Sequence, residues 1–197
     1  MLPPDPPARC LAPDEFVSPP GEPAYDAVFV GELRQLKGVA TLLEAAALLS
    51  QRPNTFRLGI AGAGPDEAAL RTMASKMRLE GNVDFLGFRK AREVFALGRV
   101  VVVPSYAESF PYIVLEAIAA GRPVVASSVG GIPEMFGSAA SALVVPGDAA
   151  ALASAIASTL DDPVVAQARA GALRERARRL YRIETMAASV TDSMAKS

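Results

Sequence analysis

The sequence contains no histidine, and Cys10 is its single cysteine. Without histidine, the chain itself offers no histidine-based catalytic triad, no imidazole proton relay and no histidine ligand for a metal. A single thiol excludes a disulfide within the chain and fits a reducing compartment. These absences remove histidine-dependent and disulfide-stabilised classes from the functions to consider.

The chain also lacks an excess of charge of either sign and a long apolar run. It has 20 lysines and arginines against 21 aspartates and glutamates, so its charge does not favour binding to nucleic acid. No apolar stretch reaches the roughly 18 residues that a membrane span needs. The first residues are acidic and rich in proline, without the charged and apolar regions of a signal peptide. We therefore expect a cytoplasmic protein.

The composition predicts one globular domain between two tails. Hydrophobic residues make up 51% of the 197 residues, which is enough for a sizeable core. Residues 1–24 hold eight prolines, and because proline fixes φ and removes a backbone donor, they predict an extended linker that continues from something upstream. Residues 25–180 form the expected domain, and residues 181–197 a helical C-terminal tail.

Short apolar runs alternate with segments of helical periodicity through the expected domain. Uninterrupted valine, isoleucine and leucine runs that alternate with helices predict a parallel sheet covered on both faces, an α/β fold of the doubly wound, Rossmann-like kind. With six strands, the default strand order is 3-2-1-4-5-6. The predicted strands are residues 27–30, 56–61, 83–86, 100–103, 123–126 and 142–145.

This strand order places the carboxyl ends of the first and fourth strands side by side, where doubly wound sheets bind ligands. The loop after the first strand, residues 31–38, begins and ends with glycine and contains Arg34 and Lys37. Backbone donors at a helix start and fixed cations suit a diphosphate. The alternative is a tight turn from strand to helix with solvated charges.

The loop after the fourth strand, residues 104–110, leads into a helix that we expect to start near Ser109 or Phe110. Glu108 and Glu116 lie eight positions apart across this junction. A carboxylate can grip two neighbouring hydroxyls or stabilise an oxocarbenium-like centre. The alternatives are a dipole partner for Glu108 and a surface position for Glu116. Tyr112 is a lid over a ligand or a core residue.

Several motifs together resemble the C-terminal half of retaining GT-B glycosyltransferases of the GT4 type, the glycosyltransferase group 1 family. They are Glu108-x7-Glu116 (the EX7E motif), its continuation Glu-Ala-x-Ala-x-Gly-x-Pro-Val-Val, and Gly130-Gly-Ile-Pro-Glu134. Turns at residues 31–38, 62–65, 85–87 and 146–148 follow in the order that this family uses. The similarity covers roughly residues 14–180, and the combined pattern is highly specific.

The resemblance implies a role for each position that matches the family's motifs. Lys37 neutralises the diphosphate of a nucleotide-sugar donor, Glu108 acts at the donor sugar as the catalytic residue, and Glu116 holds the ribose. The N–H groups that follow Glu108 meet sugar hydroxyls or phosphate, and two other turns border the base. The implied substrate-binding residues are Gly31, Arg34, Lys37, Gly64, Phe88, Ser109, Phe110, Tyr112, Ile113 and Glu116.

Two positions depart from the family's pattern. Glu32 stands where the family has an arginine, and its charge repels phosphate, although Arg34 is available two residues later. Pro111 stands where the family has a glycine, and proline lacks one N–H group that would point at the ligand. We expect the anion contacts of this chain to differ in detail.

The implied reaction transfers a sugar from a nucleoside diphosphate to an acceptor hydroxyl, with the anomeric configuration retained. The resemblance implies no cofactor and no metal, because the leaving diphosphate would be stabilised by cations and helix dipoles. It also implies a separate N-terminal domain that binds an acceptor glycan or lipid-linked sugar, so we expect this chain alone to be inactive. Peripheral association of the longer enzyme with the inner face of a membrane is compatible with such an acceptor.

Other functions remain open at this point. A GT-B fold also carries sugar phosphorylases and epimerases, and a non-catalytic nucleotide-sugar-binding module would explain Glu32 and Pro111. A nicotinamide dehydrogenase fits less well. Its Gly-x-Gly-x-x-Gly fingerprint would begin at Gly62, but Glu67 stands in the third glycine position and Asp84 lies within the next strand.

Overall fold

The computed structural model describes residues 23–52, 55–109 and 111–181. The strands are β1 (Tyr25–Val30), β2 (Leu58–Ala61), β3 (Val83–Gly87), β4 (Gly98–Val103) and β5 (Val124–Ala126). The helices are α1 (Val39–Leu49), α2 (Glu67–Lys76), α3 (Ala91–Leu97), α4 (Tyr112–Ala119), α5 (Ile132–Phe136), α6 (Ala149–Asp161) and α7 (Pro163–Leu180). Two 3₁₀ helices, η2 (Gln35–Lys37) and η3 (Gly137–Ala142), complete the elements of these described residues. Most of the predicted linker, and all of the predicted C-terminal tail except Tyr181, lie outside the described residues.

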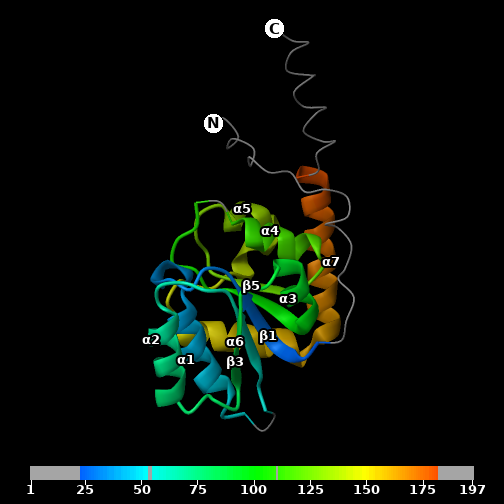
Figure 1. The fold of residues 1–197 in the computed structure, drawn as a ribbon. Helices are drawn as coiled ribbons and strands as arrows, with labels where there is room; N and C mark the ends of the chain where they lie inside the picture. The colour runs from blue at the N-terminus through cyan, green and yellow to red at the C-terminus, as the bar shows by residue number, and fades with distance from the viewer. Residues whose placement is uncertain (1–22, 53–54, 110, 182–197) are drawn as a thin grey trace, which may run out of the picture.

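The five strands form one parallel sheet in the order β3-β2-β1-β4-β5 (Figure 1). Strand β1 lies in the middle and pairs with β2 on one side and β4 on the other, with Ala27 opposite Leu58 and Val100. The predicted α/β class and the order of the first five strands are therefore confirmed. Since parallel strands all end at the same edge, the loops after β1, β2, β3 and β4 emerge together.

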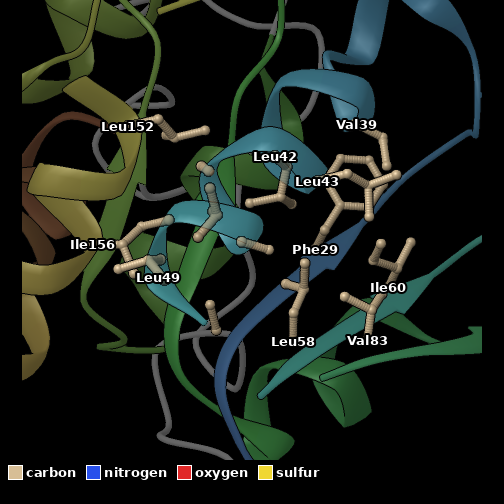
Figure 2. Close-up of a cluster of buried hydrophobic side chains, with 14 of the residues drawn as sticks. Phe29, Val39, Leu42, Leu43, Leu49, Leu58, Ile60, Val83, Leu152 and Ile156 are labelled. Atoms are coloured by element: carbon tan, nitrogen blue, oxygen red, sulfur yellow. The ribbon is translucent and has the colours of Figure 1, made fainter. Parts of the chain in front are cut away.

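Two apolar cores lie on opposite faces of the sheet because successive strand residues point to opposite sides. Phe29 and Ile60 belong to the core under α1, α2 and α6, and Figure 2 shows Leu42 and Leu43 of α1 beside Phe29. Their neighbours Val28 and Ala61 belong to the core under α3, α4, α5 and α7. Burial on both faces explains why the strands appear in the sequence as uninterrupted apolar runs.

The predicted sixth strand at residues 142–145 is reduced to a single bridge. Within the described residues, Val144 pairs with Ser127 in an isolated parallel bridge, and η3 occupies the residues before it. The cause is local. The alanines of η3 favour a helical turn on one side, and Pro146 prevents extension on the other. The predicted doubly wound architecture holds with five strands.

The helix that carries Glu116 begins later than expected. Helix α4 starts at Tyr112, with Pro111 as its N-cap residue at ψ 65°. A proline disfavours the helical conformation at the residue before it, so a helix start at Ser109 or Phe110 conflicts with Pro111. The helix ends as predicted, because Gly121 follows its C-cap residue with a φ of 70°.

Among the described residues, no single helix is long and apolar enough to cross a membrane. Helices α6 and α7 pass such a test of length and composition only when taken together, and the pair is bent by 102°.

Candidate functional site

The two loops that the sequence singles out lie next to each other at the carboxyl edge of the sheet. Strands β1 and β4 are direct neighbours, so the chain leaves both strands on the same side of the molecule. The loops are joined by a backbone hydrogen bond, in which the Tyr106 N–H donates to the Leu36 carbonyl over 2.9 Å. This contact connects the loop that carries Lys37 to the loop that carries Glu108.

Gly38 lets the loops approach this closely. Its φ is 68°, a left-handed conformation that favours glycine, and it separates η2 from α1. A Cβ atom at this position would lie 1.9 Å from the Pro104 carbonyl oxygen, which is far inside van der Waals contact. The second glycine of the first loop therefore fixes the distance between the strand ends.

The side chains of Lys37 and Glu108 form an ion pair at this junction. Lys37 Nζ donates to Glu108 Oε1 over 2.7 Å. The Glu108 side chain is 8% exposed and that of Lys37 is 28% exposed, so the carboxylate is the more deeply placed partner. Partial exclusion of water strengthens the attraction relative to that of a surface pair. The structure thus brings together the lysine that is predicted to bind phosphate and the carboxylate that is predicted to contact the sugar.

Ser105 is a site residue that the sequence analysis missed. It is completely buried at the end of β4, and its Oγ donates to the same Glu108 Oε1 over 2.7 Å. The available signal was a hydroxyl residue that ends an apolar run three positions before Glu108. A buried polar side chain needs a hydrogen-bond partner, and the one nearby in sequence is this carboxylate.

The glycine turn of the third motif supports the Glu108 backbone. Gly130 has a φ of 51°, and a Cβ atom there would lie 1.9 Å from the Glu108 carbonyl oxygen. The next residue, Gly131, lies near Pro111, since a Cβ atom on this glycine would lie 3.7 Å from Pro111 Cδ. The turn after β5 therefore fits under the loop that carries the carboxylate.

The start of α4 lies directly after this loop. Val114 and Leu115 both donate their N–H groups to the Pro111 carbonyl, over 3.0 and 3.2 Å. Tyr112 and Ile113 thus form the start of the first turn, where an α-helix has no acceptor of its own for N–H groups and the dipole is positive. Glu116 follows in the second turn and is half-buried, as is Tyr112.

Arg34 is placed differently from Lys37. It is half-exposed, and its guanidinium lies 3.4 Å from the carboxylate of Glu32. It also lines a hollow of about 370 Å³ between α1 and α2, together with Asp66 and Tyr106. Glu32 therefore partly neutralises the charge of Arg34, the residue that could replace the arginine typical of the family.

The remaining predicted residues lie at the same edge of the sheet as the Lys37–Glu108 pair. Gly31 follows β1, and Gly64 follows β2 and lies against the backbone of Leu33. Phe88 follows β3 and is 86% exposed. Ser109 is exposed. Phe110 lies outside the described residues.

A second contact between the loops predicts a stability effect. The hydroxyl of Tyr106 lies 2.7 Å from Thr41 Oγ1, and Thr41 is 3% exposed in α1. Replacing Tyr106 by phenylalanine should lower the free energy of unfolding by about 1–2 kcal/mol, because the buried Thr41 hydroxyl loses its partner. Urea unfolding measures this change. A Thr41→Val, Tyr106→Phe double variant that is less stable than the single Tyr106→Phe variant would contradict this explanation.

The sequence and the fold are matched by known proteins. The family model for glycosyl transferases group 1 matches residues 24–162. Glycogen synthase of Mycobacterium tuberculosis is 37% identical over 153 residues, which are 76% of this chain and 37% of that protein. D-inositol 3-phosphate glycosyltransferase of Corynebacterium glutamicum is 38% identical over 144 residues, 68% of this chain and 34% of that protein.

Among solved structures, HepE of Anabaena in complex with UDP superposes with a TM-score of 0.77. Its identity is 24%, and the match covers 88% of this chain and 50% of that one. A likeness at this identity shows the fold.

The parallel sheet in this order, covered by helices on both faces, is a Rossmann-like domain of the kind that forms one half of a GT-B fold. The chain belongs to the glycosyl transferases group 1 family. The predicted resemblance is thus confirmed, and the curated relatives carry the names of sugar-transferring enzymes. The chain spans about a third of the length of these relatives.

Proposed function

We propose that this chain is the donor-binding part of a retaining glycosyltransferase that uses a nucleoside-diphosphate sugar. The observation that carries the proposal is the Lys37–Glu108 pair, 2.7 Å apart, at the carboxyl edge between β1 and β4. A cation for the diphosphate and a carboxylate for the sugar lie next to each other there, as the two parts of such a donor require. Membership of the family supports the reaction class.

The diphosphate would lie against Lys37 and the start of α4. An ammonium group and the first N–H groups of a helix both favour an anion. Departure of the diphosphate is the difficult step of sugar transfer, and pre-oriented positive charge stabilises the negative charge that develops on it. We propose that this electrostatic stabilisation takes the place of a metal.

Glu108 would face the sugar and Glu116 the ribose. Glu108 can accept hydrogen bonds from sugar hydroxyls and stabilise positive charge at the anomeric carbon. A carboxylate such as Glu116 can bind two neighbouring ribose hydroxyls. The turns at Gly64 and Phe88 would border the base. HepE was solved with UDP, a nucleotide of this class.

In the proposed reaction, the bond between the anomeric carbon and the phosphate oxygen breaks, and its electron pair leaves with the diphosphate. The acceptor hydroxyl approaches the same face of the sugar, so the configuration is retained. That approach places the hydroxyl beside the departing phosphate oxygen, which can take its proton. We propose that an acceptor domain outside this chain presents the acceptor glycan or lipid-linked sugar, and that transfer takes place in the cytoplasm.

Nucleotide binding tests this proposal directly. We expect a nucleoside diphosphate such as UDP, GDP or ADP to raise the melting temperature, and NAD to leave it unchanged. A ligand present at 100 times its Kd adds about 2.7 kcal/mol, which corresponds to a rise of several degrees for a chain of this size. A thermal-shift series, followed by calorimetric titration, measures the effect. The donor site is refuted if none of the three diphosphates binds.

The Glu32–Arg34 pair favours a second candidate, a nucleotide-sugar-binding module without transferase activity. Glu32 lies beside the arginine at 3.4 Å and opposes phosphate binding there. The two functions differ in turnover. A catalytic full-length protein consumes its donor in the presence of acceptor, whereas a binding module retains the nucleotide sugar intact. Turnover by the 197-residue chain alone would contradict the need for a second domain.

A further inference from the structure

Ser105 has the features of a residue whose purpose is to hold another side chain. It is completely buried, although it is polar, and it lies where β4 ends and the Glu108 loop begins. Its Oγ donates to Glu108 Oε1 over 2.7 Å. The residue has no direct access to a ligand, because none of its surface is exposed.

Glu108 Oε1 accepts hydrogen bonds from two donors of unequal rigidity. Lys37 donates from a long, flexible side chain that is 28% exposed. Ser105 donates from a short side chain at the end of a central strand, surrounded by protein. A diphosphate that binds Lys37 competes with Glu108 for the ammonium group, whereas no ligand can reach Ser105. After donor binding, the serine is the partner that keeps the carboxylate in place.

We propose that Ser105 is a positioning residue that holds the Glu108 carboxylate toward the donor sugar while Lys37 engages the diphosphate. This inference rests on the proposed function, since it assumes a nucleotide-sugar donor at this edge. It assigns the two partners of Glu108 to different parts of the ligand. Lys37 acts on the diphosphate, and Ser105 acts on the sugar through Glu108.

The backbone of the loop does not depend on the serine hydroxyl. The Tyr106 N–H is bonded to the Leu36 carbonyl at 2.9 Å, and Gly130 lies against the Glu108 carbonyl. Removing the hydroxyl should therefore leave the loop in position and release only the carboxylate. A released carboxylate adopts several rotamers and meets the sugar less often in its productive orientation.

The experiment compares a nucleoside diphosphate with its sugar conjugate on the Ser105→Ala variant. The probes are UDP with UDP-glucose, GDP with GDP-mannose and ADP with ADP-glucose, and the pair that the unsubstituted chain binds is used for calorimetric titration. We expect the Kd of the sugar nucleotide to rise about 10-fold or more, as for loss of one hydrogen bond to a charged group. The Kd of the diphosphate should change less than about 2-fold, because it depends on Lys37.

Two further variants separate positioning from a general structural effect. Ser127→Ala removes another buried serine, 2% exposed, from the end of β5 and should change neither Kd. In a Glu108→Ala background, Ser105→Ala should raise the Kd of the sugar nucleotide no further. Ser105→Cys keeps the volume with a weaker donor and should give an intermediate Kd, which also serves if the alanine variant is poorly folded by circular dichroism.

The possible failures are distinguishable. An unsubstituted chain that binds no diphosphate refutes the donor site, and the role of Ser105 falls with it. If the unsubstituted chain binds both probes, the donor site stands. The role of Ser105 alone is then refuted if Ser105→Ala weakens the binding of both probes equally, or of neither. A further loss in the Glu108→Ala background would also overturn it, because Ser105 would then act on the ligand by another route.

Discussion

Replacement of Lys37 by alanine is expected to reduce nucleoside diphosphate affinity about 100-fold or more and to destabilise the fold. The binding loss follows from removal of the cation that would contact the diphosphate, since a charge-assisted contact in a partly closed site contributes several kcal/mol. The stability loss follows from Glu108, whose side chain is 8% exposed and would lose its positive partner. We expect about 1–3 kcal/mol, below the value for a fully buried pair because Lys37 is partly solvated.

A double variant separates the two effects. Lys37→Ala combined with Glu108→Gln removes both charges, so it should recover most of the stability and none of the nucleotide affinity. Lys76→Ala is the matched control, because Lys76 is an exposed lysine in the last turn of α2. Urea unfolding and calorimetric titration give the two quantities. Nucleotide affinity that survives in Lys37→Ala would show that the diphosphate is bound elsewhere.

Replacement of Gly38 by alanine is expected to destabilise the fold strongly. The alanine would be strained by the positive φ of 68°, and its Cβ would lie 1.9 Å from the Pro104 carbonyl oxygen. Both atoms belong to backbone-anchored groups, so the loops after β1 and β4 must separate. We expect a loss of about 3–5 kcal/mol, the sum of the strain and the displacement. Nucleotide binding should fall with it, because Lys37 is the preceding residue.

Two other glycines provide the controls for this prediction. Gly87 has a φ of 66°, and a Cβ atom there would meet nothing within 4 Å, so Gly87→Ala reports the strain alone. Gly81→Ala has open space and no positive φ, and should be close to neutral. In urea unfolding, the free energy of unfolding should be much lower for Gly38→Ala than for Gly87→Ala. It should also be lower for Gly87→Ala than for Gly81→Ala. Equal losses at Gly38 and Gly87 would show that the loops can separate without cost.

The fold was largely predictable because its signals are local and repeated. Each strand is buried on both faces, so it appears in the sequence as an uninterrupted apolar run, and the strand order follows from general rules for parallel sheets. The two wrong details come from competition between neighbouring residues. Helix α4 starts at Tyr112 because of Pro111, and residues 142–145 are shortened to a bridge between an alanine-rich turn and Pro146.

The candidate site was predictable in its location and only partly in its contacts. The strand order alone places the loops of Lys37 and Glu108 side by side. Their direct pairing depends on side-chain rotamers, and the burial of Ser105 depends on packing, which a linear pattern does not encode. Arg34 illustrates the same limit, because its proximity to Glu32 is a matter of side-chain geometry. The roles of these residues toward a donor stay predictions.

The central position of β1 has a consequence for the order of folding. Lys37 and Glu108 are 71 positions apart in the sequence. They meet only after β1 has paired with β4, and this pairing closes a longer loop than the pairing of β1 with β2. A folding intermediate in which β1 is paired only with β2 would contain the loop of Lys37 without the carboxylate of Glu108 beside it. Competence to bind an anion therefore arises late, and its recovery during refolding reports that β4 has joined β1.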